Sequence, residues 1–132
     1  MLGTILCVDD DPITLMLCKM VITKASFSNE IVTAKNGQEA LKYFDAFKTI
    51  ANANNKPQLI FLDLNMPVMN GWEFLESFNT ANYLEYHQTK VIILSSTIDP
   101  EDLEKSKKYP MVIDFLSKPI SKEMLELLKG KI

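Results

Sequence analysis

The sequence has no apolar run as long as the roughly 18 residues that a membrane span requires. It also lacks a strong excess of charge, since its net charge is -3 and its basic residues form no cluster beyond the interrupted run at 105–108. A nucleic-acid surface needs such a cluster. The first eight residues carry no basic segment, and acids follow at once, unlike a secretory signal. We therefore expect a cytoplasmic protein without nucleic-acid or membrane partners.

Cysteine is scarce as well. Cys7 and Cys18 are the only two, and both stand in apolar contexts. Such contexts are typical of small core residues in a reduced protein rather than of a disulfide or a metal pair. The sequence contains no repeat, low-complexity tract or linker. With 132 residues, 47% of them hydrophobic and 23% charged, it predicts one soluble globular domain over 1–132.

Short apolar segments alternate with longer amphipathic segments along the chain. The apolar segments, each predicted to be a strand, are 4–8, 30–34, 59–62, 91–94 and 112–116. Two of the intervening helices are predicted to begin at Asp11-Pro12 and Asp99-Pro100, where an N-cap residue precedes a proline at the first helical position. The others are predicted to begin at Asn36-Gly37, after Gly71 and after Ser121. Polar stretches at 51–58 and 79–89 are predicted to be connections.

The three strands 4–8, 59–62 and 91–94 are apolar throughout rather than alternating, as expected for strands covered on both faces. Right-handed crossovers then place helices on both faces of a parallel sheet. We predict an α/β fold with a doubly wound, flavodoxin-like sheet of five parallel strands in the order 2-1-3-4-5. The chain reverses direction between the first and third strands, and ligands bind outside the carboxyl ends of the strands at that point.

Polar residues follow four of the predicted strands at their carboxyl ends. They are Asp9 and Asp10, Asp63, Ser95 and Ser96, and Lys118. Three carboxylates at one edge repel one another, and partial burial increases the repulsion. A cation must balance them, either Lys118 or a divalent metal. Oxygen ligands favour a hard ion, and the Asp10–Asp63 pair suits Mg²⁺, which usually takes one or two protein carboxylates.

Four motifs, CVDDDP, LDLNMPVMNGWEF, ILSS and FLSKPI, stand at these strand ends. In this order and spacing they make the chain resemble the receiver domain of two-component response regulators over essentially its whole length. The resemblance is to the stand-alone, chemotaxis-regulator type, with no output domain in 1–132. It implies a phosphoacceptor signalling module rather than an enzyme. The implied partners are a histidine kinase or histidine phosphotransfer protein and an unknown downstream protein, and a homodimer is an option within the family.

The resemblance assigns roles in phosphoryl and metal binding. It implies that Asp63 is the phosphoacceptor and that Asp10 binds Mg²⁺ directly. Asp9 would bind the metal through water, and Asn65 would supply a backbone carbonyl. Lys118 would pair with phosphoryl oxygens, and the peptide bond that follows it is typically cis in the family.

The resemblance also implies a switch. Ser95 would move toward the phosphoryl group, Ser96 would contact it through its backbone, and Phe115 would be the switch aromatic. Their rearrangement would alter the surface of the fourth helix, fifth strand and fifth helix for partner binding. Ser96, Met111-Val112 and Phe115 depart from the small apolar residue, Gly-Ala pair and tyrosine that are usual there.

Two other functions fit parts of the pattern. One is a small Mg²⁺-dependent phosphohydrolase with an aspartyl intermediate. Asn65 argues against it, since it stands where such an enzyme needs an acid to protonate the leaving group. The other is a degenerate receiver that acts only as a binding scaffold, and the full set of Asp63, Ser95, Lys118 and the acid pair argues against that.

Overall fold

The structure is a computed structural model that describes residues 2–47 and 56–131. Most of the predicted connection at 51–58 lies outside the described residues. Within the described ranges, no helix is both long enough and apolar enough to cross a membrane.

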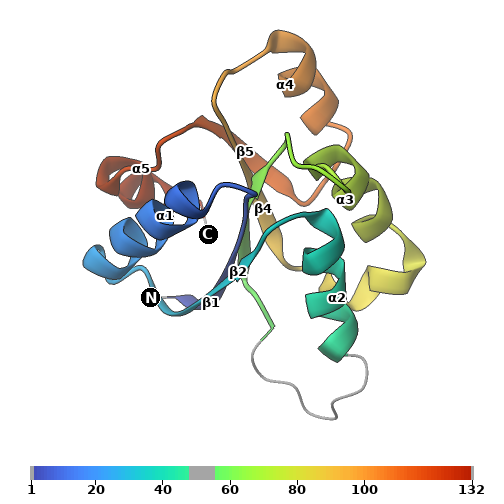
Figure 1. The fold of residues 1–132 in the computed structure, drawn as a ribbon, viewed down its shortest axis with the longest axis horizontal. Helices are drawn as coiled ribbons and strands as arrows, with labels where there is room; N and C mark the ends of the chain where they lie inside the picture. The colour runs from blue at the N-terminus through green and yellow to red at the C-terminus, as the bar shows by residue number, and fades with distance from the viewer. Residues whose placement is uncertain (1, 48–55, 132) are drawn as a thin grey trace.

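Strands and helices alternate along the described chain (Figure 1). The strands are β1 (Leu2–Val8), β2 (Ser28–Ala34), β3 (Leu59–Asp63), β4 (Lys90–Ser95) and β5 (Val112–Ser117). The α-helices are α1 (Pro12–Lys24), α2 (Gly37–Phe47), α3 (Gly71–Phe78), α4 (Pro100–Ser106) and α5 (Lys122–Leu128). Each predicted strand and helix is therefore confirmed. The strands extend one or two residues beyond most predicted ends, because backbone pairing continues into polar residues such as Asp63, which pairs with Leu94.

The predicted connection at 79–89 contains a short 3₁₀ helix, η1 (Ala81–Tyr86). Its two tyrosines, Tyr83 and Tyr86, are buried. The ring of Tyr86 lies 5.1 Å from that of Phe44 on α2, and the ring of Tyr83 lies 5.9 Å from that of Phe78 on α3. This segment is polar in composition, yet it covers one end of the core because two large aromatic side chains turn inward.

The sheet has the order β2-β1-β3-β4-β5, and all neighbouring strands are parallel. The predicted doubly wound, flavodoxin-like fold is thus confirmed. Figure 1 shows α1 and α5 on one side of the sheet and α2 and α3 on the other. Successive residues of β1 supply both core layers, since side chains alternate along a strand. Leu6 and Val8 pack with the α2–α3 side, and Ile5 and Cys7 with the α1–α5 side.

Side-chain caps fix the starts of the helices near the sheet edge. Asp11 and Asp99 each accept a hydrogen bond from the backbone two residues later, at 3.0 and 2.9 Å, and a proline follows each of them. Asn70 and Glu73 form a reciprocal capping box at the start of α3. These caps set where each loop from a strand to a helix ends, and so they set the shape of the edge where the polar residues gather.

Candidate functional site

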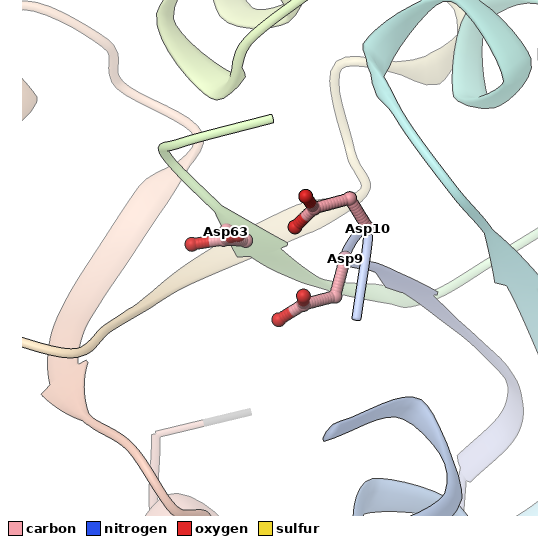
Figure 2. Close-up of side chains that lie close together, drawn as sticks. All are labelled: Asp9, Asp10 and Asp63. Atoms are coloured by element: carbon pink, nitrogen blue, oxygen red, sulfur yellow. The ribbon is translucent and has the colours of Figure 1, made fainter. Parts of the chain in front are cut away.

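Three acids meet at the carboxyl ends of β1 and β3 (Figure 2). Asp9 and Asp10 directly follow β1, and Asp63 is the last residue of β3. One carboxylate oxygen from each acid lies within 4.8 Å of those of the other two. Asp9 and Asp63 are only 4% and 5% exposed, whereas Asp10 is exposed. The structure therefore brings together the three acids that the sequence placed at the point of strand reversal.

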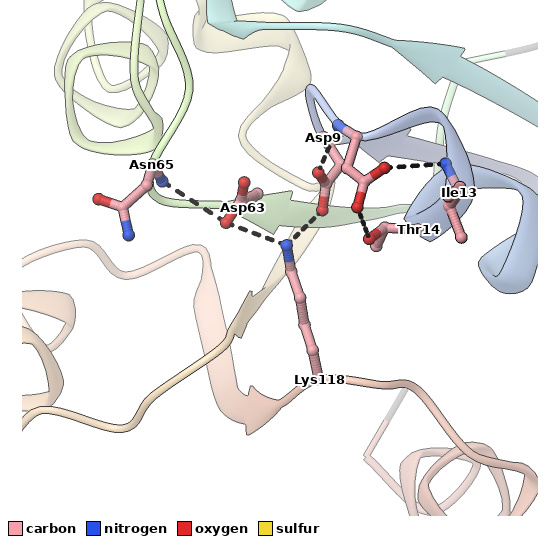
Figure 3. A network of polar contacts seen from close by, with 7 residues as sticks. Asp9, Ile13, Thr14, Asp63, Asn65 and Lys118 are labelled. Carbon is pink, nitrogen blue, oxygen red and sulfur yellow. Dashed lines mark hydrogen bonds and ion pairs between the residues drawn. The ribbon is translucent and has the colours of Figure 1, made fainter.

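Lys118 bridges the two buried acids (Figure 3). Its Nζ lies 2.6 Å from Asp9 Oδ2 and 3.3 Å from Asp63 Oδ1. The backbone holds the lysine in place, since its amide donates to the carbonyl of Ser95 at 2.8 Å. The peptide bond between Lys118 and Pro119 is cis. The lysine thus acts as the internal counter-ion of the acid site, and it lies closer to Asp9 than to Asp63.

Burial and neighbouring charges control the ionisation of this site. Burial raises the pKa of Asp63, the negative charge of Asp9 raises it further, and Lys118 offsets part of the shift. Burial alone would lower the pKa of Lys118, but its bonds to Asp9 and the charge of Asp63 outweigh that effect and raise the pKa. The lysine is therefore protonated at neutral pH. Asp63 is a more basic carboxylate than an exposed one, which suits a nucleophile.

The backbone around the acids is fixed by local hydrogen bonds. The amide of Asp9 donates to the carbonyl of Ala34 at 3.0 Å, and the amide of Asp11 donates to Asp9 Oδ1 at 3.0 Å. Asp11 is occupied as the cap of α1, where it also accepts from Thr14 Oγ1 at 3.1 Å (Figure 3). Of the three consecutive acids, Asp9 faces the lysine, Asp11 caps the helix, and exposed Asp10 remains at the outer rim.

The other predicted site residues lie around the same edge. Ser95 is 3% exposed and follows Leu94, the strand partner of Asp63, while Ser96 is exposed. The backbone amide of Asn65 approaches Asp63 Oδ1 at 3.5 Å. Phe115 is 7% exposed and packs in the core layer on the α2–α3 side.

Gly71 is a further residue that shapes the site, and the sequence marked it only as the residue before a helix, whereas it is the first residue of α3. Its amide donates to the carbonyl of Leu64 at 3.0 Å. A Cβ at this position would lie 2.9 Å from Leu64 Cα and closer still to the carbonyl oxygen of Asp63. Only glycine lets α3 begin this close to the end of β3. A glycine at the start of a helix has many explanations, so the sequence alone did not reveal this contact.

The donor set fits a hard divalent cation. Three carboxylates face one ammonium group, so the cluster keeps an excess of negative charge. Its donors are all oxygens, which Mg²⁺ prefers, and Asp10 is exposed to solvent, which supplies the waters that this ion retains. The candidate ligands are Asp10, Asp63 and the backbone carbonyl of Asn65, with Asp9 reached through water.

The fold and this site together define a flavodoxin-like protein with an acidic, lysine-bridged cation site at its topological switch point. The chain belongs to the response regulator receiver domain family, whose sequence model matches residues 5–128. It is thus a receiver domain of two-component response regulators. Receiver domains are generally signalling modules that bind Mg²⁺ at an acidic pocket and interact with kinases or phosphotransfer proteins and with downstream effectors.

Curated relatives and solved structures agree with this family. The chain is 31% identical to the transcriptional regulatory protein HptR of Staphylococcus aureus, over 100% of this chain and 46% of that protein. It is 32% identical to a protein-glutamate methylesterase/protein-glutamine glutaminase of Bacillus subtilis, over 96% of this chain and 32% of that protein. The chain thus spans about half or less of the length of these curated relatives.

Among solved structures, a two-component response regulator from Cytophaga hutchinsonii superposes with a TM-score of 0.88 at 29% identity, covering 98% of this chain and 96% of that one. The chemotaxis protein CheY4 of Vibrio cholerae gives a TM-score of 0.79 at 26% identity, covering 100% and 99%.

Proposed function

We propose that this chain is a phosphoacceptor module in which Asp63 accepts a phosphoryl group, in a Mg²⁺-dependent reaction, from a histidine kinase or histidine phosphotransfer protein. The observation that carries the proposal is the lysine-bridged acid cluster at the switch point. Asp63 lies in it with Asp9, Asp10 and Lys118, each from a strand end of the sheet. A carboxylate can act as the nucleophile, and phosphoryl transfer depends mainly on positioning and on neutralising charge.

Each residue has a distinct part in the proposed transfer. An oxygen of Asp63 attacks the phosphorus, and the bond from phosphorus to the donor nitrogen breaks. Bound Mg²⁺ would supply positive charge to the phosphoryl oxygens. Lys118 would supply a second positive charge, since its Nζ already lies 3.3 Å from Asp63 Oδ1. Asp10, Asp9 and the Asn65 carbonyl would hold the metal.

Phosphorylation would redistribute the contacts of Lys118 and Ser95. A phosphoryl group adds negative charge and strong acceptors. Lys118 and Ser95 would then each gain a charge-assisted hydrogen bond worth roughly 1.5–3 kcal/mol. We propose a further contact from the backbone of Ser96. Because Lys118 now pairs most closely with Asp9, at 2.6 Å, the new bond competes with an existing one.

The proposed output is the surface formed by α4, β5 and α5. Phe115 is buried in β5 in this structure, and Ser95 ends β4 next to the segment that leads to α4. Movement of Ser95 would therefore act on α4 through four intervening residues, 96–99. We propose that this change alters the binding of a downstream protein or of a second copy of the chain, and that residues 1–132 act as one receiver domain in the cytoplasm, without substrate turnover.

The test is phosphorylation by the small donor acetyl phosphate. Intact-mass analysis should show one added phosphoryl group in the presence of Mg²⁺ and none in the presence of EDTA. Asp63→Asn should show no gain. Asp11→Asn is the matched control, because asparagine also caps helices and the change lies outside the proposed ligands.

Three results would contradict the proposal. An equal mass gain in Asp63→Asn would place the phosphoryl group on another residue. Continuous hydrolysis of a generic phosphate ester, faster than the decay of the label, would favour a phosphohydrolase. Absence of both Mg²⁺ binding and labelling would favour a binding scaffold.

A further inference from the structure

Cys7 and Cys18 form a buried pair directly beneath the acid site. Cys7 lies on β1 and Cys18 on α1, and they are 1% and 4% exposed. Both thiols line the same small cavity, and neither is in a disulfide. The sequence treated them as two separate core residues, 11 positions apart. In the structure they belong to the same core layer between the sheet and α1 and line one cavity.

The pair shares a small cavity with the acids. The cavity has a volume of about 10 Å³, and Cys7, Cys18, Asp9 and Asp63 all line it. This is close to the minimum of about 10–15 Å³ that a single water needs. Apolar side chains complete the lining of the cavity. Hydrogen peroxide, which is somewhat larger than water, must displace them slightly to reach the thiols, whereas a bulky reagent must displace them much further. Most buried cysteines are inert, and this cavity and the partner thiol distinguish the pair from them.

The chain connecting the two cysteines carries the acids. Asp9 follows Cys7 by two residues, so both side chains leave the same face of the strand. Asp10 and Asp11 come next, and α1 then begins and brings Cys18 back against β1. A bond between the two sulfurs would close residues 7–18 into a ring that contains all three consecutive acids. Any strain in that ring would act on the positions of the metal-site carboxylates.

We propose that Cys7 and Cys18 are a redox-sensitive pair that a small hydroperoxide converts into a disulfide, and that this disulfide changes the affinity of the acid site for Mg²⁺. The first part stands on the pairing of the thiols alone. The second part rests on the proposed Mg²⁺ site.

The reaction consumes one hydrogen peroxide for each disulfide. The sulfur of Cys18 attacks one peroxide oxygen, the O–O bond breaks, and hydroxide leaves and takes up the thiol proton to form water. The sulfur of Cys7 then attacks the Cys18 sulfenic acid. The S–S bond forms, the S–O bond breaks, and a second water leaves with the proton of Cys7. Cys18 is assigned the first attack because it is the more exposed of the two thiols, at 4% against 1%.

The first experiment counts free thiols after treatment of the folded, reduced protein with hydrogen peroxide. The protein is then unfolded and alkylated with iodoacetamide. Untreated protein should take up two alkyl groups, and oxidised protein none until dithiothreitol is added. Peptide mapping should recover residues 7 and 18 in one disulfide-linked product. Oxidation of the seven methionines adds oxygen without changing the thiol count, so it does not confuse this measurement.

Access is tested by the size of the oxidant. In the folded protein, cumene hydroperoxide should remove thiols at least tenfold more slowly than hydrogen peroxide, and the difference should shrink in denaturant. Equal rates in the folded protein would mean that oxidation occurs only after unfolding, which would overturn the proposal. So would retention of both thiols under hydrogen peroxide, or the appearance of disulfide-linked dimers in place of the internal bond.

Single variants provide the control. In Cys7→Ser, the Cys18 sulfenic acid has no resolving thiol and should be trapped by dimedone. The near-UV circular dichroism of Trp72 reports whether each variant keeps its fold. If the folded Cys7→Ser variant loses the Cys18 thiol without being labelled by dimedone, the assigned order of attack is contradicted.

The second experiment is a calorimetric titration of the reduced and oxidised proteins with MgCl₂. The oxidised protein should differ at least threefold in its dissociation constant, and dithiothreitol should reverse the difference. Equal constants after complete oxidation would overturn the coupling. Failure of the reduced protein to bind Mg²⁺ would instead refute the proposed function. The thiol count would still test disulfide formation, because it does not depend on Mg²⁺.

Discussion

Replacing Lys118 with methionine removes the charge that bridges Asp9 and Asp63 and keeps an unbranched side chain of similar length. The lysine side chain is 17% exposed, and those of the two acids are 6% and 7% exposed. Two nearly buried carboxylates would then face each other and Asp10 without a counter-ion. We expect the metal-free variant to be less stable than the wild type, and added Mg²⁺ to restore much of the loss.

The magnitude follows from the burial of the pair. Removing one partner of a buried ion pair costs about 3–5 kcal/mol. The lower end applies here because part of the lysine reaches solvent, so we expect a loss of about 3 kcal/mol. An unfolding entropy of about 2.1 cal/mol/K per residue gives about 0.28 kcal/mol/K for 132 residues. The loss therefore corresponds to a fall in Tm of about 10 °C.

The assay is thermal unfolding followed by circular dichroism, in EDTA and then in excess MgCl₂. Lys122→Met is the matched control, since Lys122 is exposed on α5 and its loss should change little. Mg²⁺ should raise the Tm of Lys118→Met by more than it raises that of the wild type, because the variant lacks an internal cation. A destabilisation below about 1 kcal/mol, or an equal effect of Mg²⁺ on both proteins, would refute the role of Lys118 as counter-ion.

Three further predictions concern single side chains. The pKa of Asp63 is raised in the folded state, so the protonated carboxyl group stabilises the fold at pH values below its ordinary pKa of 3.8. This stabilisation is lost as the pH rises through the folded-state pKa. In metal-free buffer Asp63→Asn should therefore resist urea better than the wild type at pH 7, with a gap that narrows at pH 3; lower stability at pH 7 would contradict this. Gly71→Ala should lose about 2–3 kcal/mol in urea unfolding, since backbone atoms of Asp63 and Leu64 fill the space for a Cβ; a loss within about 0.5 kcal/mol would show that α3 can shift freely. Tyr109→Phe removes a 2.6 Å hydrogen bond to exposed Glu76 and should cost about 1 kcal/mol. Burial and that bond raise the pKa of Tyr109 to about 12, so the absorbance change that is lost in the variant should be centred near pH 12; a loss centred near the ordinary value of 10 would disprove the shift.

The positions of the acids could be predicted because they depend on strand ends alone. Once the parallel order was inferred from apolar strands, Asp9, Asp10, Asp63 and Lys118 had to share one edge, and the structure places them there. The exact lengths of the strands could not be predicted, because periodicity reports side-chain burial whereas strand length depends on backbone pairing. The sequence also did not show that Lys118 lies nearer to Asp9 than to Asp63, since that choice depends on differences of less than an ångström.

Contacts between segments far apart in the chain were beyond sequence reasoning. Trp72 on α3 stacks on Tyr109 with ring centroids 6.1 Å apart, and Lys105 Nζ lies 4.7 Å from the Trp72 ring. These contacts join α3 to α4, and no local pattern specifies which aromatic residue meets which cation. The pairing of Cys7 with Cys18 is of the same kind. It requires β1 and α1 to pack with these two residues in register, which apolar patterning alone does not determine.

The most direct measurement of the central claim is chemical identification of the modified residue. The protein is treated with acetyl phosphate and Mg²⁺, and the acyl phosphate is then reduced with borohydride, which converts a phosphorylated aspartate into homoserine. Peptide mapping should find homoserine at position 63, only when both Mg²⁺ and acetyl phosphate were present. Homoserine at position 9 or 10 instead, or at no position in a protein that has gained phosphoryl mass, would contradict Asp63 as the phosphoacceptor.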